Sequence, residues 1–217
     1  MKSKAEDIYA RSVHQWRLLH DNGYFDNHRH CVGFPVSQHL SDEMIGRLLT
    51  FKEDDVVLEI GCGYGRIVSA VADHVKEIVG IDVHDNPINR GRKLLRDKPN
   101  AALYVTDGMT IPFPERTFTV VYSCSVMQHL PRPLVERYIS EACRVLTVGG
   151  VMCIQFQNAF FFPAERHKAI RIDRAKEQTR TWFDFEIAQL VIGLPLRHSI
   201  ARRGKSDLYL IAEKTNA

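Results

Sequence analysis

The chain has 217 residues, of which 45% are hydrophobic and 25% charged, and its formal net charge is +3. This length suits one domain with a sizeable core, and the composition is that of an ordinary globular protein. The mild charge gives no argument for nucleic-acid binding. No apolar stretch approaches the roughly 18 residues of a membrane span, and the start of the chain lacks a signal-peptide core. The five cysteines contain no C-x-x-C pair, so we interpret them as reduced side chains of a cytoplasmic protein.

Residues 1–50 are expected to form a helical cap within the same domain as the rest of the chain. Apolar residues recur loosely over 5–20, which predicts a helix that stops at Asp21-Asn22-Gly23. Ser41 is a good N-cap for a second helix over 42–49.

The irregular segment 24–39 between these helices contains His28, His30 and His39, which invite a metal-site interpretation. A zinc site needs several Cys or His ligands in a defined frame, and no second half of such a frame follows, so we predict no metal. The segment is then either a solvated loop or a lid, in which Tyr24, Phe25 and His28 face the substrate.

The most informative stretch runs from Val56 to Gly65. The apolar run 56–60 predicts a buried parallel strand, three alternate glycines predict a tight turn, and apolar residues at helical spacing predict a helix over 66–75. Such a turn brings backbone N–H groups close to a ligand at a helix N-terminus. A second strand over 77–81 ends in Asp82, an acid placed to bind the hydroxyls of a ribose.

Two cofactor classes use this arrangement. The dinucleotide fingerprint G-x-G-x-x-G/A requires a small last residue, but Arg66 occupies that position. The spacing from Glu59 to Gly65 is acid-x-G-x-G-x-G, which resembles motif I of the class I S-adenosylmethionine-dependent methyltransferases. A structural glycine turn that binds nothing is the plain alternative.

Downstream segments resemble the same family in the same order. A helix is expected from Asn86-Pro87 to about Arg96, followed by a strand over 102–105 and the turn Thr106-Asp107-Gly108. In similar enzymes an acid at this turn binds the adenine amino group, and Asp107 matches that acid. The alternative is that Asp107 only forms the turn. The segment 111–118 resembles the one that precedes the family's fourth strand, with Thr119 in place of a frequent aspartate.

The resemblance implies a set of cofactor-binding residues, namely Glu59, Gly61, Cys62, Gly63, Gly65, Asp82, Val83, Asp107, Gly108, Met109 and Ser123.

The loop 123–131 after the predicted fourth strand, 118–122, resembles the loop that faces the methionine part of the cofactor. It lacks the Asn/Asp-Pro-Pro-aromatic sequence of enzymes that methylate base or amide nitrogens, and the clustered acids of the metal-dependent catechol type. Cys124 lacks the frame expected of a nucleophile for base methylation. His129 is the candidate catalytic base, because histidine titrates near neutral pH; a structural role in the loop is the alternative. Gln128 is assigned to substrate binding.

A strongly amphipathic helix is expected over 133–146, ended by Gly149-Gly150, with a fifth strand over 151–156. The phrase Glu141 to Gly150 resembles the family's E-x-x-R-V-L-k-P-G-G. Residues 158–183 are expected to be an acceptor-side insertion, in which the basic run 164–180 is helical and either solvated or in contact with an anionic acceptor. A helix to about Ile192 and an antiparallel hairpin over 196–201 and 207–212 complete the chain.

The resemblance covers about 48–214 and implies an α/β fold: a seven-stranded, mostly parallel sheet with helices on both faces and an antiparallel last strand. Residues 51–217 form the expected S-adenosylmethionine-binding domain. We expect a methyltransferase for a small-molecule acceptor, acting as a monomer or homodimer, and we expect neither nucleic acid nor a membrane as its partner. The alternatives are a protein or RNA methyltransferase, and a non-catalytic partner subunit with this fold.

Overall fold

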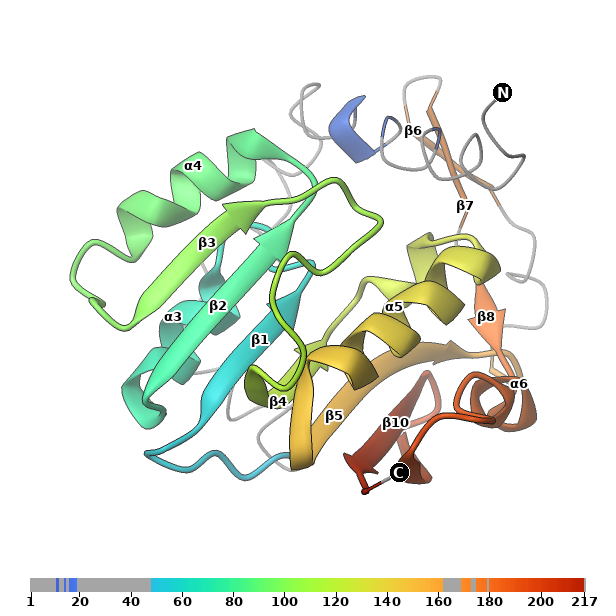
Figure 1. Cartoon of the computed structure of the whole chain (residues 1–217). Helices are drawn as coiled ribbons and strands as arrows, with labels where there is room; N and C mark the ends of the chain where they lie inside the picture. The colour runs from blue at the N-terminus through green and yellow to red at the C-terminus, as the bar shows by residue number, and fades with distance from the viewer. Residues whose placement is uncertain are drawn as a thin grey trace, which may run out of the picture.

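The structure, a computed structural model, describes Arg11, His14 and residues 16–18, 48–161, 169–172, 175–178 and 180–216. These residues form an eight-stranded sheet of order β3-β2-β1-β4-β5-β10-β9, with the short β8 beside β5, and a separate β6-β7 hairpin. β10 runs antiparallel between β5 and β9, so the expected mostly parallel sheet with an antiparallel last strand is confirmed (Figure 1).

The strands are β1 (Val56–Ile60), β2 (Glu77–Asp82), β3 (Ala101–Val105), β4 (Phe118–Ser123), β5 (Leu146–Asn158), β6 (Ala169–Ile172), β7 (Ala175–Gln178), β8 (Thr181–Trp182), β9 (Leu196–Arg203) and β10 (Asp207–Lys214). The α-helices are α3 (Arg66–Val71), α4 (Asp85–Leu94), α5 (Arg132–Val145) and α6 (Asp184–Gln189), and two 3-10 turns are η1 (Ala72–His74) and η2 (Met127–His129).

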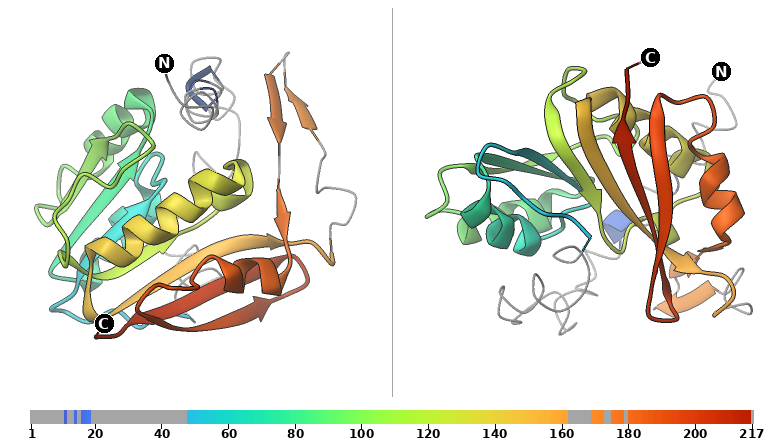
Figure 2. Two further views of the ribbon diagram at one scale, coloured as in Figure 1. Left: turned by 45° about the vertical axis from the view of Figure 1, so that its right-hand side comes forward. Right: turned by 90° about the horizontal axis from the view of Figure 1, so that it is seen from below.

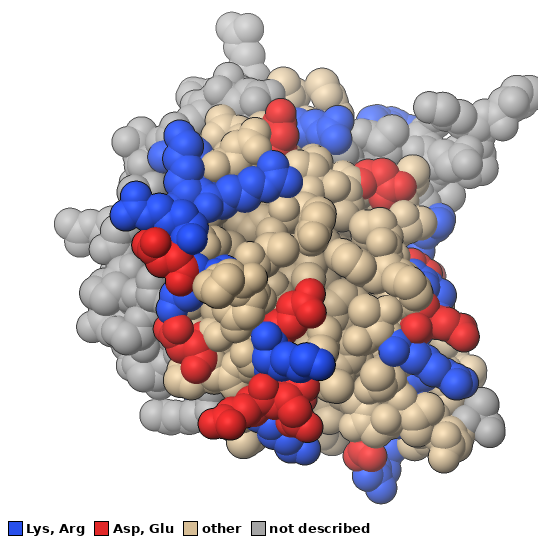
Figure 3. Space-filling view, turned by 60° about the vertical axis from the view of Figure 1, so that its left-hand side comes forward, with Lys and Arg blue, Asp and Glu red and all other residues tan. Residues whose placement is uncertain are grey.

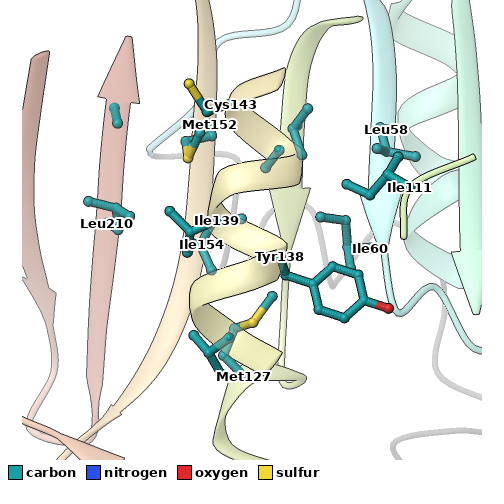
Figure 4. Packing of buried hydrophobic residues seen from close by; sticks show 14 of the residues in the cluster. Leu58, Ile60, Ile111, Met127, Tyr138, Ile139, Cys143, Met152, Ile154 and Leu210 are labelled. Atoms are coloured by element: carbon teal, nitrogen blue, oxygen red, sulfur yellow. The ribbon is translucent and has the colours of Figure 1, made fainter. Parts of the chain in front are cut away.

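The helices cover both faces of the sheet, as Figure 2 shows. Alternate residues of a strand point to opposite faces, and the core divides accordingly. Leu58 and Ile60 of β1 pack with the apolar face of α5, including Tyr138 and Ile139, as Figure 4 shows. Val57 instead belongs to the second cluster, with residues of α3 and α4.

The register of the parallel strands brings their carboxyl ends to one edge. Ile60 at the end of β1 pairs with Ile81, one residue before Asp82, and Glu59 pairs with Tyr122 of β4. Three chain reversals therefore begin side by side, after β1, β2 and β4. In open α/β sheets this is where ligands bind.

The end of α5 differs from the expectation that Gly149-Gly150 would stop the helix. The helix ends at Val145, and β5 begins at the next residue. Backbone N–H groups of Arg116 and Thr117 donate to the carbonyls of Arg144 and Val145 (3.1 and 2.8 Å), which satisfies the helix end. The two glycines lie within β5, where the pairing with β4 shifts register.

The expected helix over 164–180 was wrong, because the described part of this run forms the β6-β7 hairpin. Its charged residues suggested a solvated helix, but Ile170 and Ile172 alternate with Ala169 and Arg171, which is the period of a strand.

The N-terminal cap lies largely outside the described residues, as do Tyr24, Phe25, His28 and the other loop histidines. Arg11, His14 and Trp16–Leu18 are helical, in agreement with a first helix over 5–20. Leu48 and Leu49 are not helical, so the second expected helix does not extend to Leu49.

The exposed surface of α4 carries Arg90, Arg92 and Lys93, and exposed Arg96 follows the helix. Figure 3 views the molecule from the side of α4 and β3, and shows acidic side chains interspersed among the basic ones. No helix in the described part of the chain combines the length and apolar character needed to cross a bilayer. The described side chains also include no group of three or more His, Cys, Asp or Glu residues suited to a metal ion.

An arginine–glutamate pair fixes α5 to the loop before β4. Arg144 donates to both carboxylate oxygens of Glu141 (2.8 Å each) and to the carbonyls of Phe113 and Ile111 (2.9 Å each). Glu141 in turn accepts the N–H of Ile111 at 3.0 Å. This geometry explains the E-x-x-R spacing that the sequence shares with the family.

We predict that Arg144→Met lowers the free energy of unfolding by about 2 kcal/mol, because it leaves the Glu141 carboxylate and two loop carbonyls without their donor. Urea denaturation measures this. The matched control is Arg197→Met, which removes an exposed pair with Glu213 and should change stability by less than about 1 kcal/mol. Equal effects of the two substitutions would contradict the assigned role of Arg144.

Candidate functional site

The glycine turn after β1 is anchored to the end of β2. The N–H groups of Gly61 and Cys62 donate to the carbonyl of Ile81 at 2.8 and 3.0 Å. Gly61 has φ +74°, and a Cβ there would lie 2.3 Å from Cγ2 of Val126, so the loop after β4 packs directly against the turn. A Cβ on Gly63 would meet no atom of the described residues within 4 Å, so that part of the chain leaves this position open.

Asp82 points at the glycine turn. Its Oδ2 accepts the N–H of Gly63 at 2.9 Å, and its Oδ1 accepts those of Val83 and His84 at 2.7 and 3.3 Å. Burial raises the pKa of this carboxyl, although the three N–H groups act to lower it. Each carboxylate oxygen can accept more than one hydrogen bond, so the same group can also receive hydroxyls from a ligand beside Gly63.

Glu59 lies beneath the turn, where only 3% of its surface is exposed. The hydroxyl of Tyr122 donates to its Oε2 at 3.1 Å. Burial raises the pKa of Glu59 to about 8, against the lowering effects of Tyr122 and of the charge on Arg66. The carboxyl is therefore largely protonated at neutral pH, and a positive charge placed nearby would favour its ionised form.

Cys62 and Ser123, two further predicted cofactor residues, are buried below the turn. Ser123 donates its hydroxyl to the carbonyl of Ile60 at 2.9 Å and so joins β4 to β1. The Cys62 side chain packs beneath Gly80 of β2. Burial also raises the pKa of the Cys124 thiol well above its usual range, which disfavours a nucleophilic thiolate.

The third strand ends in a turn closed by Asp107. Its Oδ1 accepts the N–H groups of Met109 and Thr110 at 2.8 and 3.0 Å. Partial burial acts to raise the pKa of Asp107, but these hydrogen bonds outweigh it and the pKa is lowered. Asp107 thus stabilises the turn. Its carboxylate is exposed and can still accept hydrogen bonds from a ligand. Gly108 adopts φ +77° next to it.

The loop after β4 brings Gln128 and His129 to the same edge of the sheet. His129 lies in η2, and its N–H donates to the carbonyl of Val126 at 2.9 Å, the residue that packs on Gly61. The indole of Trp16 contacts the imidazole edge to face, with ring centroids 4.7 Å apart. Next to it, Arg17 donates to the carbonyl of Val83 at 3.2 Å.

The described residues of the first helix therefore bridge two sides of the site, the turn after β2 and the loop after β4. The sequence predicts an N-terminal helical cap but does not identify Trp16 and Arg17, since a helix with a loose apolar face does not reveal which residues reach a distant loop. It also missed His84, whose Nδ1 accepts the N–H of Asn86 at 3.0 Å and caps α4.

We predict that Glu59→Gln stabilises the fold increasingly as pH rises. The folded pKa of about 8 lies above the reference value of 4.5, so the native state binds more protons between these values and the wild type loses stability across that window. Melting temperatures at pH 5.5, 7 and 8.5 should diverge in favour of the variant, which keeps an acceptor for Tyr122. If the melting temperatures of the two proteins change with pH in parallel, the pKa of Glu59 is not raised in the folded state.

Known proteins are similar to this chain in sequence. A family described as methyltransferase domain matches residues 57–150. A 2-methyl-6-phytyl-1,4-hydroquinone methyltransferase of Synechocystis is 30% identical over 168 residues, covering 70% of this chain and 51% of that protein. The 27-O-demethylrifamycin SV methyltransferase of Amycolatopsis mediterranei is 28% identical over 159 residues, covering 70% and 56%. The chain thus spans about half the length of these curated relatives.

Solved structures agree on the fold. A DhpI complex with SAH superposes with a TM-score of 0.72 at 14% identity, covering 97% of this chain and 98% of that one. A SAM-dependent methyltransferase of Methanosarcina mazei gives a TM-score of 0.64 at 20% identity, covering 78% and 96%. Residues 57–150 thus match a methyltransferase domain, and the chain has the fold of solved S-adenosylmethionine-dependent methyltransferases.

Proposed function

We propose that this chain transfers a methyl group from S-adenosylmethionine to a small-molecule acceptor. The observation that carries the proposal is the hydrogen bond from the N–H of Gly63 to the Asp82 carboxylate, at 2.9 Å. It lies beside a turn whose middle glycine the described residues leave open. The relatives named above methylate a hydroquinone and a rifamycin by name, which supports a small acceptor. The family also supports S-adenosylmethionine as the cofactor.

The residues at the carboxyl edge of the sheet fit this cofactor. Asp82 would accept the ribose hydroxyls, the turn 61–65 would lie along the ligand, and Asp107 with Gly108 and Met109 would border the adenine. Glu59, Cys62 and Ser123 are buried below the turn, so they would act by shaping it and, for Glu59, by charge. When bound, the cofactor supplies an electrophilic methyl group on a sulfonium.

The protein's own part is to align the acceptor and to exclude water, which together can lower a barrier by several kcal/mol. Trp16 covers the His129 side of the site and Arg17 covers the Val83 side. We assign His129 the role of accepting the proton that the acceptor hydroxyl or amine loses on methylation. Its place next to Val126, and through it next to Gly61, supports this role.

The proposed organisation has one methyltransferase domain over 51–217, with 1–50 as a cap of that domain. The acceptor-side insertion, 158–183, carries β6, β7 and β8. Monomer and homodimer remain the two proposed assembly states.

Asp82→Ala should weaken binding of S-adenosylhomocysteine by roughly 1–3 kcal/mol, since it removes charge-assisted hydrogen bonds to the ribose. Calorimetry with the purified full chain measures this. Asp97→Ala is the matched control, because Asp97 is an exposed acid paired with Arg96 away from the site, and its affinity should equal that of the wild type. An unchanged affinity of the Asp82 variant would remove this residue from the site.

The reaction itself is tested by incubating the chain with S-adenosylmethionine and a panel of hydroquinones, phenols and hydroxylated small molecules. Release of S-adenosylhomocysteine together with a methylated acceptor supports the proposal. Methylation only of protein or RNA substrates in parallel incubations would reject the small-molecule assignment while leaving the cofactor site intact.

A further inference from the structure

Two arginines converge on the loop that carries His129. Arg180 donates its backbone N–H to the carbonyl of Gln128 at 2.6 Å, and its Nη1 donates to the carbonyl of His129 at 3.2 Å. The segment leading into β8 is thereby fixed to η2. The Arg180 guanidinium lies at the same edge of the sheet as the glycine turn, because Val126 packs on Gly61 and bonds to His129.

Arg132, at the start of α5, supplies the second guanidinium. Its charged carbon lies 4.1 Å from the centroid of the Trp182 ring, and its Nη2 is 3.0 Å from Glu186 Oε1. Trp182 is two residues after Arg180 on the same segment. A planar guanidinium held on an aromatic face keeps its edge available for oxygen atoms.

The two positive charges are close enough to affect each other. The pKa of Arg180 is lowered, first by burial and then by the charge of Arg132. Bringing like charges together in a half-buried place costs free energy. Glu186 offsets part of that cost at Arg132, and a bound anion beside the two side chains would offset more of it. Arginine favours carboxylate and phosphate groups because its N–H donors match their geometry.

Buried polar atoms nearby point to a ligand as well. Gln128 and Trp182 are 7% and 1% exposed, and within the described residues Gln128 Oε1 and Trp182 Nε1 have no hydrogen-bond partner. Buried polar atoms of this kind are normally satisfied by protein, water or ligand. The Trp182 donor suits an oxyanion, whereas the Gln128 acceptor suits an O–H or N–H group of the same ligand.

We propose that Arg180 and Arg132 form an oxyanion subsite that binds the carboxylate or phosphate group of the methyl acceptor. The subsite selects acceptors that carry such a group a short distance from the atom that is methylated. The identification of the ligand as the acceptor rests on the proposed function; the existence of an oxyanion site at these residues does not.

The test uses inorganic phosphate as the probe and intrinsic fluorescence as the readout. The chain has two tryptophans, and both lie at this place, Trp16 on His129 and Trp182 under Arg132. Phosphate is titrated at pH 7.5 and constant ionic strength, with and without saturating S-adenosylhomocysteine. We expect a saturable change in the wild type in both conditions.

Arg180→Met should weaken phosphate binding about tenfold or more, the loss expected for a charge-assisted contact, and Arg180→Lys should fall between. Arg197→Met, on β9 and paired with Glu213, should match the wild type. Circular dichroism and calorimetric binding of S-adenosylhomocysteine show whether the variants fold.

Three results would overturn the subsite: an unsaturable response equal to that of chloride, equal affinities in the wild type and Arg180→Met, or an Arg180→Lys variant no better than Arg180→Met despite normal folding. Competition between phosphate and S-adenosylhomocysteine would overturn the acceptor assignment, because the arginines would then hold the cofactor's own carboxylate. Failure of S-adenosylhomocysteine to bind the wild type, with phosphate still bound, would instead reject the proposed function alone.

Discussion

The hydrogen bond from the N–H of Gly63 to Asp82 is the contact on which the site depends. It joins the turn after β1 to the end of β2, and it orients the carboxylate toward the open side of the turn. The parallel register makes the contact possible, since Ile60 pairs with Ile81 and the two strands therefore end together. A shift of one residue would turn every side chain of the strand to the opposite face and would separate the carboxylate from the turn.

Several ionisable side chains surround this contact, and burial affects their protonation. Glu59 is held largely neutral below the turn, with Tyr122 as its donor. Two arginines are held near η2 by an aromatic ring, a carboxylate and backbone carbonyls. The site therefore has carboxyl groups under the proposed cofactor position and guanidinium groups near the proposed acceptor position, on the two sides of the Val126 to His129 loop. The carboxyl groups come from the ends of β1 and β2, and the guanidinium groups come from the start of α5 and the residue before β8.

The sequence predicted the sheet and the glycine turn because both depend on local patterns: apolar runs, glycines in the left-handed region, and an acid one position beyond a strand. It also predicted the closing hairpin, where apolar and polar residues alternate around Gly204-Lys205-Ser206. Contacts between residues distant in the chain could not be predicted from these local patterns. The end of α5 is set by Arg116 and Thr117, which are distant in sequence, and charge misled the interpretation of 164–180. Trp16, Arg17 and Arg180 each contact a segment that is distant in sequence. No pattern in either segment predicts such a contact.

A crystal structure of the full chain with S-adenosylhomocysteine tests the central claim most directly. We predict both ribose hydroxyls within hydrogen-bond distance of the Asp82 carboxylate, the turn at Gly61 unchanged, and the sulfur facing the loop that carries His129. A ligand bound elsewhere, or an Asp82 carboxylate that contacts only the backbone of Gly63, Val83 and His84, would contradict it.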